Sequence, residues 1–202
     1  MKIYLLAATS AILMIGSVGK ISAQHGNTKA NHVTFGVKGG LNVYNIHNDN
    51  NVKYDTKLGF HLGMLGHVHL SKQFALQPEL LYSDQGAKYT IANNEFKLNL
   101  GYINVPVMLQ YMFDNGFRLQ AGPQVGFLTR AKSVANNTKT DVKDNFKTVD
   151  FAVGFGAGYV NPKSGLGIDA RYNLGLSDIN ENSTVKSTNR GFQVGLFYLM
   201  KH

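Results

Sequence analysis

The feature that most constrains this sequence is an alternation of side-chain character with a period of two. Val149, Phe151, Val153, Phe155 and Tyr159 fall on one face of an extended chain, and the residues on the other face are aspartate, alanine or glycine. The same division recurs in residues 117–127 and 166–177. Successive side chains of a β-strand point to opposite faces, so this period indicates strands with two unlike faces. Without any stretch of sustained helical periodicity beyond the N-terminal segment, the pattern predicts an all-β fold.

Eight such segments follow one another along the chain, at about residues 33–44, 57–70, 74–91, 95–113, 117–130, 147–160, 165–177 and 189–200. The connections after the second, fourth and sixth segments are short, and the triplet Asp114-Asn115-Gly116 is a strong hairpin signal because Asn and Gly tolerate positive φ. The connections at 45–56, 131–146 and 178–188 are long and polar. An even strand number with short turns at one end matches an eight-stranded antiparallel up-and-down transmembrane β-barrel with both termini in the periplasm.

The chemistry of the two faces favours a membrane barrel over a soluble one. A soluble barrel keeps its apolar residues inside, whereas here the glycines share their face with polar residues and the other face is aromatic and branched. The polar residues on the glycine side are Lys38, His61, His67, His69, Gln77, Glu79, Gln110, Arg118, Gln120, Asp169, Arg171 and Gln193. Aromatic residues near the short turns fit an interfacial girdle, namely Phe74, Tyr111, Phe113, Phe117, Tyr159 and Tyr198. A soluble or periplasmic barrel is the alternative.

The first residues have the pattern of a secretory signal. Lys2 precedes an uncharged run from Ile3 to Val18, and small residues precede a cleavage point after Ala23. The run is shorter than the roughly 20 apolar residues that a membrane-spanning helix requires. We therefore expect a signal peptide at 1–23, a periplasmic leader at 24–32 and an outer-membrane barrel domain at 33–202.

Three prolines interrupt the expected strands. Pro78, Pro106 and Pro123 each lack the N–H that a sheet ladder uses. We interpret them as bulge or bend sites, and a switch of phase from Tyr102 to Ile103 supports a bulge before Pro106.

Several segments contain sequence motifs that resemble those of a known family, namely Gly59–Gly63, Phe74–Ser83, Gly86–Lys88, Tyr102–Tyr111 and Arg171–Ser177. In these segments the chain resembles the PorT-like family of small outer-membrane β-barrels, often labelled porin family. The resemblance spans nearly all of the chain after the signal and implies a component of secretion or surface assembly, although the family's name implies no pore.

The last strand is similar to the signal that the barrel-assembly machinery reads. Its pattern of a polar residue, a glycine, an aromatic residue and a hydrophobic residue is carried by Gln193, Gly195, Tyr198 and Met200. The chain departs from many outer-membrane proteins in ending on Lys201-His202 rather than on an aromatic residue.

The inward charges are the candidate site. Lys38, Glu79, Arg118, Asp169 and Arg171 are expected to form a structural polar network, because the interior of an eight-stranded barrel is just wide enough for side chains to fill. Within this network we expect Glu79 to meet Arg118. The leading function is an integral outer-membrane protein with a plugged lumen and a structural, surface-interaction or secretion-accessory role. The alternative is a small-solute porin or transport protein, and a lipid-modifying enzyme is less favoured.

Other motifs predict no catalytic, cofactor-binding or metal-binding residue, and we expect no cofactor. Residues 154–158 resemble a nucleotide-binding loop, yet no helix follows them, so glycines lining a narrow lumen explain the run better. His67 and His69 could share a metal, but no carboxylate can be placed beside them, and a structural role is favoured. No nucleophile can be paired with a base, which argues against an enzyme.

The charge balance bears on partners. The chain has 20 Lys and Arg residues against 12 Asp and Glu residues, with many of the cations in the expected long loops. This charge is either solvated or contacts the phosphates of lipopolysaccharide. The absence of a basic helix or a stacking platform argues against nucleic acid. The expected partners are outer-membrane lipid, lipopolysaccharide and the barrel-assembly machinery, and the expected state is a monomer.

Overall fold

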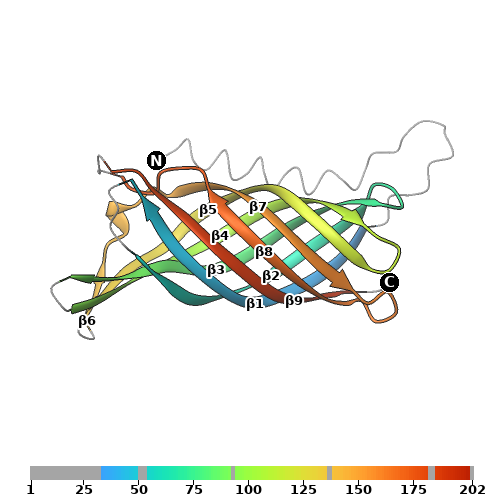
Figure 1. The fold of residues 1–202 in the computed structure, drawn as a ribbon, viewed down its shortest axis with the longest axis horizontal. Coiled ribbons are helices and arrows are strands. Elements are labelled where there is room, and N and C mark those ends of the chain that lie inside the picture. The colour runs from blue at the N-terminus through green and yellow to red at the C-terminus, as the bar shows by residue number, and fades with distance from the viewer. Residues whose placement is uncertain (1–32, 50–53, 92–93, 136–137, 182–184, 201–202) are drawn as a thin grey trace. The chain divides into compact units, whose positions relative to one another are not determined.

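The strands close into a ring (Figure 1). The computed structural model describes residues 33–49, 54–91, 94–135, 138–181 and 185–200. Its strands are β1 (Val33–Asn48), β2 (Asp55–His69), β3 (Phe74–Ile91), β4 (Asn94–Met112), β5 (Phe117–Ala135), β6 (Thr138–Asp141), β7 (Val149–Val160), β8 (Leu166–Gly175) and β9 (Ser187–Leu199). Eight of them, all except β6, pair antiparallel around the ring, and β1 closes it by pairing with β9. The prediction of an eight-stranded antiparallel barrel is confirmed.

Helical structure contributes little to the described residues. The 3-10 helix η2 (Lys143–Asn145) lies in the connection between β6 and β7. In the part of the chain that the structure describes, no helix has the length and apolar character needed to cross a membrane. The predicted signal peptide and leader lie outside the described residues and stay predictions.

Short turns join β2 to β3, β4 to β5 and β7 to β8, at the right-hand end in Figure 1. In the second turn, Gly116 has a φ of 92° and its N–H donates to the carbonyl of Phe113 at 3.0 Å. In the third turn, Gly165 has a φ of 77°. Both values lie in the left-handed region that glycine adopts without a steric penalty. The hairpin signal at Asp114-Asn115-Gly116 is therefore confirmed.

The connection expected at 131–146 is partly strand. β5 continues to Ala135, and β6 returns along Lys132–Ala135 (Figure 1). The β-branched residues Val134, Thr138 and Thr140 favour extended backbone. All four residues of β6 are exposed, so this hairpin has no buried face and lacks the two-faced pattern by which the other strands can be recognised.

A bulge interrupts the pairing of β4 with β5. Gly101 lies opposite Arg130 and Tyr102 lies opposite Leu128, so Thr129 is an extra residue on β5. Such an insertion changes the phase of the strand that carries it. β4 alternates without interruption on both sides of the bulge.

The prolines do not mark bulges. The register is unchanged on both sides of Pro78, Pro106 and Pro123, because a proline removes one N–H without adding a residue to the strand. The predicted phase switch from Tyr102 to Ile103 is also wrong, since the extra residue belongs to the partner strand.

The two faces of the strands are as predicted. On the outside, Phe155, Ile168 and Leu196 each expose about half of their surface, at 49%, 48% and 59%. The polar residues predicted to face inward are buried, with the exception of His69, which is exposed at the end of β2. An outer surface of this kind is what lipid requires.

Aromatic rings gather at the short-turn end, as predicted for a girdle. The ring centroids of Phe74 and Tyr111 are 5.3 Å apart, those of Tyr111 and Phe113 are 4.9 Å apart, and those of Phe113 and Phe117 are 5.5 Å apart. These contacts form one continuous row across β3, β4 and β5. Aromatic side chains are favoured where hydrocarbon meets the polar interface.

Candidate functional site: the barrel interior

Two acids and two bases meet inside the barrel. Arg171 on β8 binds Glu79 on β3 through two hydrogen bonds, Nη2 to Oε1 at 2.8 Å and Nη1 to Oε2 at 3.1 Å. Lys38 on β1 lies 2.5 Å from Oδ2 of Asp169 and 3.7 Å from Oε2 of Glu79. The side chains of all four are at most 4% exposed. These four residues, named here the ion cluster, connect strands that are not neighbours in the ring.

Side-chain amides complete the ion cluster. Gln77 donates to Oε1 of Glu79 at 2.8 Å, and Gln120 donates to Oδ2 of Asp169 at 3.2 Å. Oε1 of Gln120 accepts a further hydrogen bond from Nη2 of Arg171 at 3.1 Å. Buried charges are tolerated when they are paired and hydrogen-bonded, and these amides supply part of that hydrogen bonding; Nε of Arg171 is left without an acceptor among the described residues.

Arg118 stands apart from the acids. Its Nη1 donates to Oε1 of Gln110 at 3.2 Å, and its guanidinium carbon lies 5.7 Å from the centroid of the Phe197 ring. Among the described residues it forms no ion pair, so the expected pairing of Glu79 with Arg118 is wrong. The partner of Glu79 is Arg171, which reaches it from the opposite side of the ring.

A neutral network lies beside the ion cluster. Oδ1 of Asn42 lies 2.8 Å from Nδ1 of His61 and accepts from Gln193 at 3.1 Å. Asn173 donates to Oε1 of Gln193 and to the hydroxyl of Tyr44, both at 2.9 Å. Asn42 and Tyr44 were not predicted as network members, although they share the inward phase of Lys38 on β1.

Apolar layers bound these networks at both ends. The layer near the long loops contains Ile46, Ala87, Leu98, Leu100, Tyr102, Leu128, Ala131 and Ile179. The layer near the short turns contains Leu65, Val160, Phe197 and Leu199. Sequence analysis did not predict these layers, although most of the residues follow the inward phase of their strands.

Two loops are joined at the long-loop end. Phe146 and Asn180 form a β-bridge, and Lys147 donates its N–H to the carbonyl of Ile179 at 2.8 Å. Ile179 is fully buried in the apolar layer. The loop before β7 and the loop after β8 therefore hold each other over the mouth of the barrel.

Asp178 strengthens this junction. Its Oδ1 accepts from the N–H groups of Ser187 at 2.9 Å and Asn180 at 3.1 Å, and its Oδ2 lies 3.3 Å from Nζ of Lys147. Partial burial alone would raise the pKa of this carboxyl, but the two N–H groups and the ammonium outweigh it and hold the pKa below its usual range.

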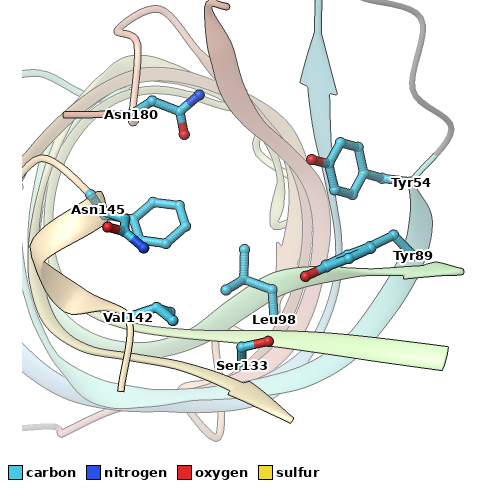
Figure 2. A pocket seen from close by; sticks show the side chains of 8 residues that line it. Tyr54, Tyr89, Leu98, Ser133, Val142, Asn145 and Asn180 are labelled. Carbon is cyan, nitrogen blue, oxygen red and sulfur yellow. The ribbon is translucent and has the colours of Figure 1, made fainter. Parts of the chain in front are cut away.

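A pocket of about 400 Å³ opens at the same mouth. Figure 2 shows its side chains around the rim of the ring: Tyr54, Tyr89, Leu98, Ser133, Val142, Asn145 and Asn180, with Phe146 among them. The rings of Tyr54 and Tyr89 meet edge to face at 5.6 Å. None of the lining side chains carries a charge.

The glycine run at 154–158 and the pair of histidines on β2 have packing roles. The run at 154–158 lies within β7, and a Cβ at Gly154 would lie 3.2 Å from Cδ of Arg171, so this glycine leaves room for the ion cluster. The rings of His67 and His69 pack edge to face with centroids 4.6 Å apart. In the described part of the chain, no three His, Asp or Glu side chains gather as a metal site would require.

The residues of the expected assembly signal divide between the two faces of β9. Gln193 and Gly195 face inward, whereas Tyr198 and Met200 are exposed on the outer face at 43% and 42%.

Comparison with known proteins decides the family. Residues 22–181 match the family model of the outer membrane protein beta-barrel domain. The chain belongs to this family. The protein is therefore an outer-membrane β-barrel protein, located in the cell outer membrane. No curated protein matches the sequence.

Two solved structures of outer-membrane proteins are similar to this chain. The crystal structure of Neisserial surface protein A (NspA) is similar with a TM-score of 0.55 at 15% identity, over 84% of this chain and 99% of that one. Ail, the attachment invasion locus protein of Yersinia pestis, is similar with a TM-score of 0.49 at 17% identity, over 82% of this chain and 98% of that one. At these identities the likeness to NspA concerns the fold.

Proposed function

We propose that this protein is an outer-membrane barrel with a plugged lumen, that its role is structural, in surface interaction or in assisting secretion, and that it is not an enzyme. The observation that carries the proposal is the ion cluster, which crosses the lumen from β1 and β3 to β8. The resemblance of the sequence to the PorT-like family supports the secretion or surface-assembly part of this role.

The energetics of the ion cluster favour a plug. Opening a water-filled path would require the bidentate contact of Arg171 with Glu79 to separate, together with the amide contacts around it. A buried charge that loses its partner is strongly destabilising, at about 3–5 kcal/mol. The apolar layers at both ends add a second barrier, because their side chains, apart from the hydroxyl of Tyr102, offer a water column no hydrogen bonds.

A small-solute porin is the second candidate, favoured by the polar lining of the lumen. A porin requires a continuous aqueous path past the ion cluster. Measuring the ion conductance of the barrel tests whether such a path exists. A lipid-modifying enzyme has less support, because no nucleophile can be paired with a base and the buried acid Glu79 is held by Arg171 and Lys38.

We propose further that both termini lie in the periplasm and the long loops at the cell surface. In this orientation the partners are outer-membrane lipid and lipopolysaccharide, and the chain is a monomer. The barrel-assembly machinery would bind β9 through Gln193, Gly195, Tyr198 and Met200. The short turns after β2, β4 and β7 and the long connections after β1 and β8 support the orientation; the connection between β3 and β4 is an exception in length.

Epitope tags test the orientation and the surface role. A tag inserted at Asn137 or at Ser183 should be accessible to antibody on intact cells, because both positions lie in long-loop connections. A tag at Asn115, in the short turn between β4 and β5, should become accessible only after the outer membrane is opened. Labelling of intact cells at Asn115 alone would contradict the proposed orientation.

A further inference from the structure

A second pocket lies on the outside of the barrel, away from the lumen. It has a volume of about 260 Å³ and lies over the long-loop ends of β1, β2, β8 and β9. Its lining includes Val43, Asn45, Tyr172, Arg190 and Phe192. We name this pocket the outer groove.

The outer groove has an apolar tier and a polar tier. Tyr172 and Phe192 are paired across β8 and β9 with ring centroids 4.7 Å apart, and Val43 lies opposite Phe192 on β1. Two residues further toward the long loops, Asn45 lies opposite Arg190. The change from aromatic to polar side chains therefore runs along β1 and β9, whereas beside them apolar residues continue through Leu174, which lies opposite Arg190, to the exposed Leu176.

The side chain of Arg190 has no hydrogen-bond or ion-pair partner among the residues that the structure describes. Its Nε is shielded from solvent and has no hydrogen-bond acceptor in the described structure. No described acid forms an ion pair with it, and no carboxylate lines the groove. Two other cations near the long loops differ in this respect, since Arg130 lies 3.7 Å from Asp84 and Lys147 lies 3.3 Å from Asp178.

A guanidinium in such a place calls for an anionic acceptor. The charge of Arg190 has no acidic partner among the described residues, and the planar fork of arginine matches the oxygens of a phosphate. Aromatic rings directly below it suit an acyl chain. The amphipathic order of the two tiers fits a membrane lipid better than a free anion or a second protein.

We propose that the outer groove binds a phosphate group of lipopolysaccharide, with Arg190 as its ligand and with an acyl chain on Tyr172 and Phe192. The choice of lipopolysaccharide over a phospholipid rests on the proposed orientation, which places the long-loop ends in the outer leaflet. His47, which also lines the groove, supplies a further polar group beside the phosphate, whereas the side-chain amide of Asn45 already donates to the carbonyl of Tyr54 at 2.9 Å.

Native mass spectrometry of the purified, folded barrel in detergent tests this site. Bisphosphorylated lipid A is the probe, and phosphatidylglycerol is the competing lipid. Arg190→Gln should weaken lipid A binding about tenfold or more, because it removes a charge-assisted hydrogen bond to the phosphate. Lys139→Gln is the matched control: it removes the same charge from the exposed strand β6 and should leave binding unchanged.

Three results would overturn the proposal. Equal lipid A binding by Arg190→Gln and the unchanged protein would remove Arg190 as the ligand. Equal weakening by Lys139→Gln would show attraction without a site. Binding of phosphatidylglycerol as tight as that of lipid A would show that the outer groove does not select lipopolysaccharide over a phospholipid. Heat-modifiable gel mobility confirms that each variant is folded. Because lipid binding in detergent does not depend on orientation in the membrane, a negative result of the epitope-tag experiment is distinguishable from a loss of lipid A binding at the outer groove.

Discussion

Replacing Arg171 with methionine should lower the free energy of unfolding by about 3–5 kcal/mol, the cost of leaving a buried charge without its partner. The change would leave Glu79 with Lys38 and Gln77 alone, and Lys38 already binds Asp169. Urea unfolding in lipid vesicles, followed by circular dichroism, measures the loss.

Two companion variants make the Arg171 result specific. Lys147→Met, which removes an exposed ion pair with Asp178, should cost less than about 1 kcal/mol. The double replacement Glu79→Leu with Arg171→Met should recover part of the loss, because it removes both charges. A loss as small for Arg171→Met as for Lys147→Met would mean that the ion cluster does not stabilise the barrel.

Replacing Leu196 with arginine should impair membrane assembly by about 2–4 kcal/mol, the cost of a cation near the middle of the bilayer. Leu196 is 59% exposed and lies near the middle of the apolar outer residues of β9, which run from Phe192 to Tyr198. Leu166→Arg is the matched control: this side chain is 53% exposed beside a short turn, where the cost falls to about 0–1 kcal/mol. The folded fraction in outer-membrane preparations measures both, and equal tolerance would contradict the assigned lipid face.

The strands could be predicted from the sequence because alternation is a local property. The segment expected at 147–160 is β7 at Val149–Val160, and its inward and outward residues are as predicted. The β6 hairpin could not be predicted in this way, because all four residues of β6 are exposed.

Contacts across the lumen could be predicted only as a set. Lys38, Glu79, Asp169 and Arg171 meet as a group, but which base reaches which acid depends on strand tilt and side-chain length around a closed ring. For this reason the sequence alone could not show that Arg171, and not Arg118, is the partner of Glu79.

The outer groove depends on the fold as well. Arg190 has the sequence character of a loop cation, yet it lies on β9 directly beyond the aromatic pair of Tyr172 and Phe192. Only the pairing of β8, β9 and β1 brings these side chains to one place on the outer surface.

Electrical recording in planar bilayers tests the plugged lumen most directly. The purified wild-type protein should give little or no steady conductance, because the ion cluster and the two apolar layers occupy the interior. The double replacement Glu79→Ala with Arg171→Ala should raise the conductance, since it removes both volume and paired charge from the lumen. A large and stable conductance of the wild-type protein would contradict the plug and favour a small-solute porin.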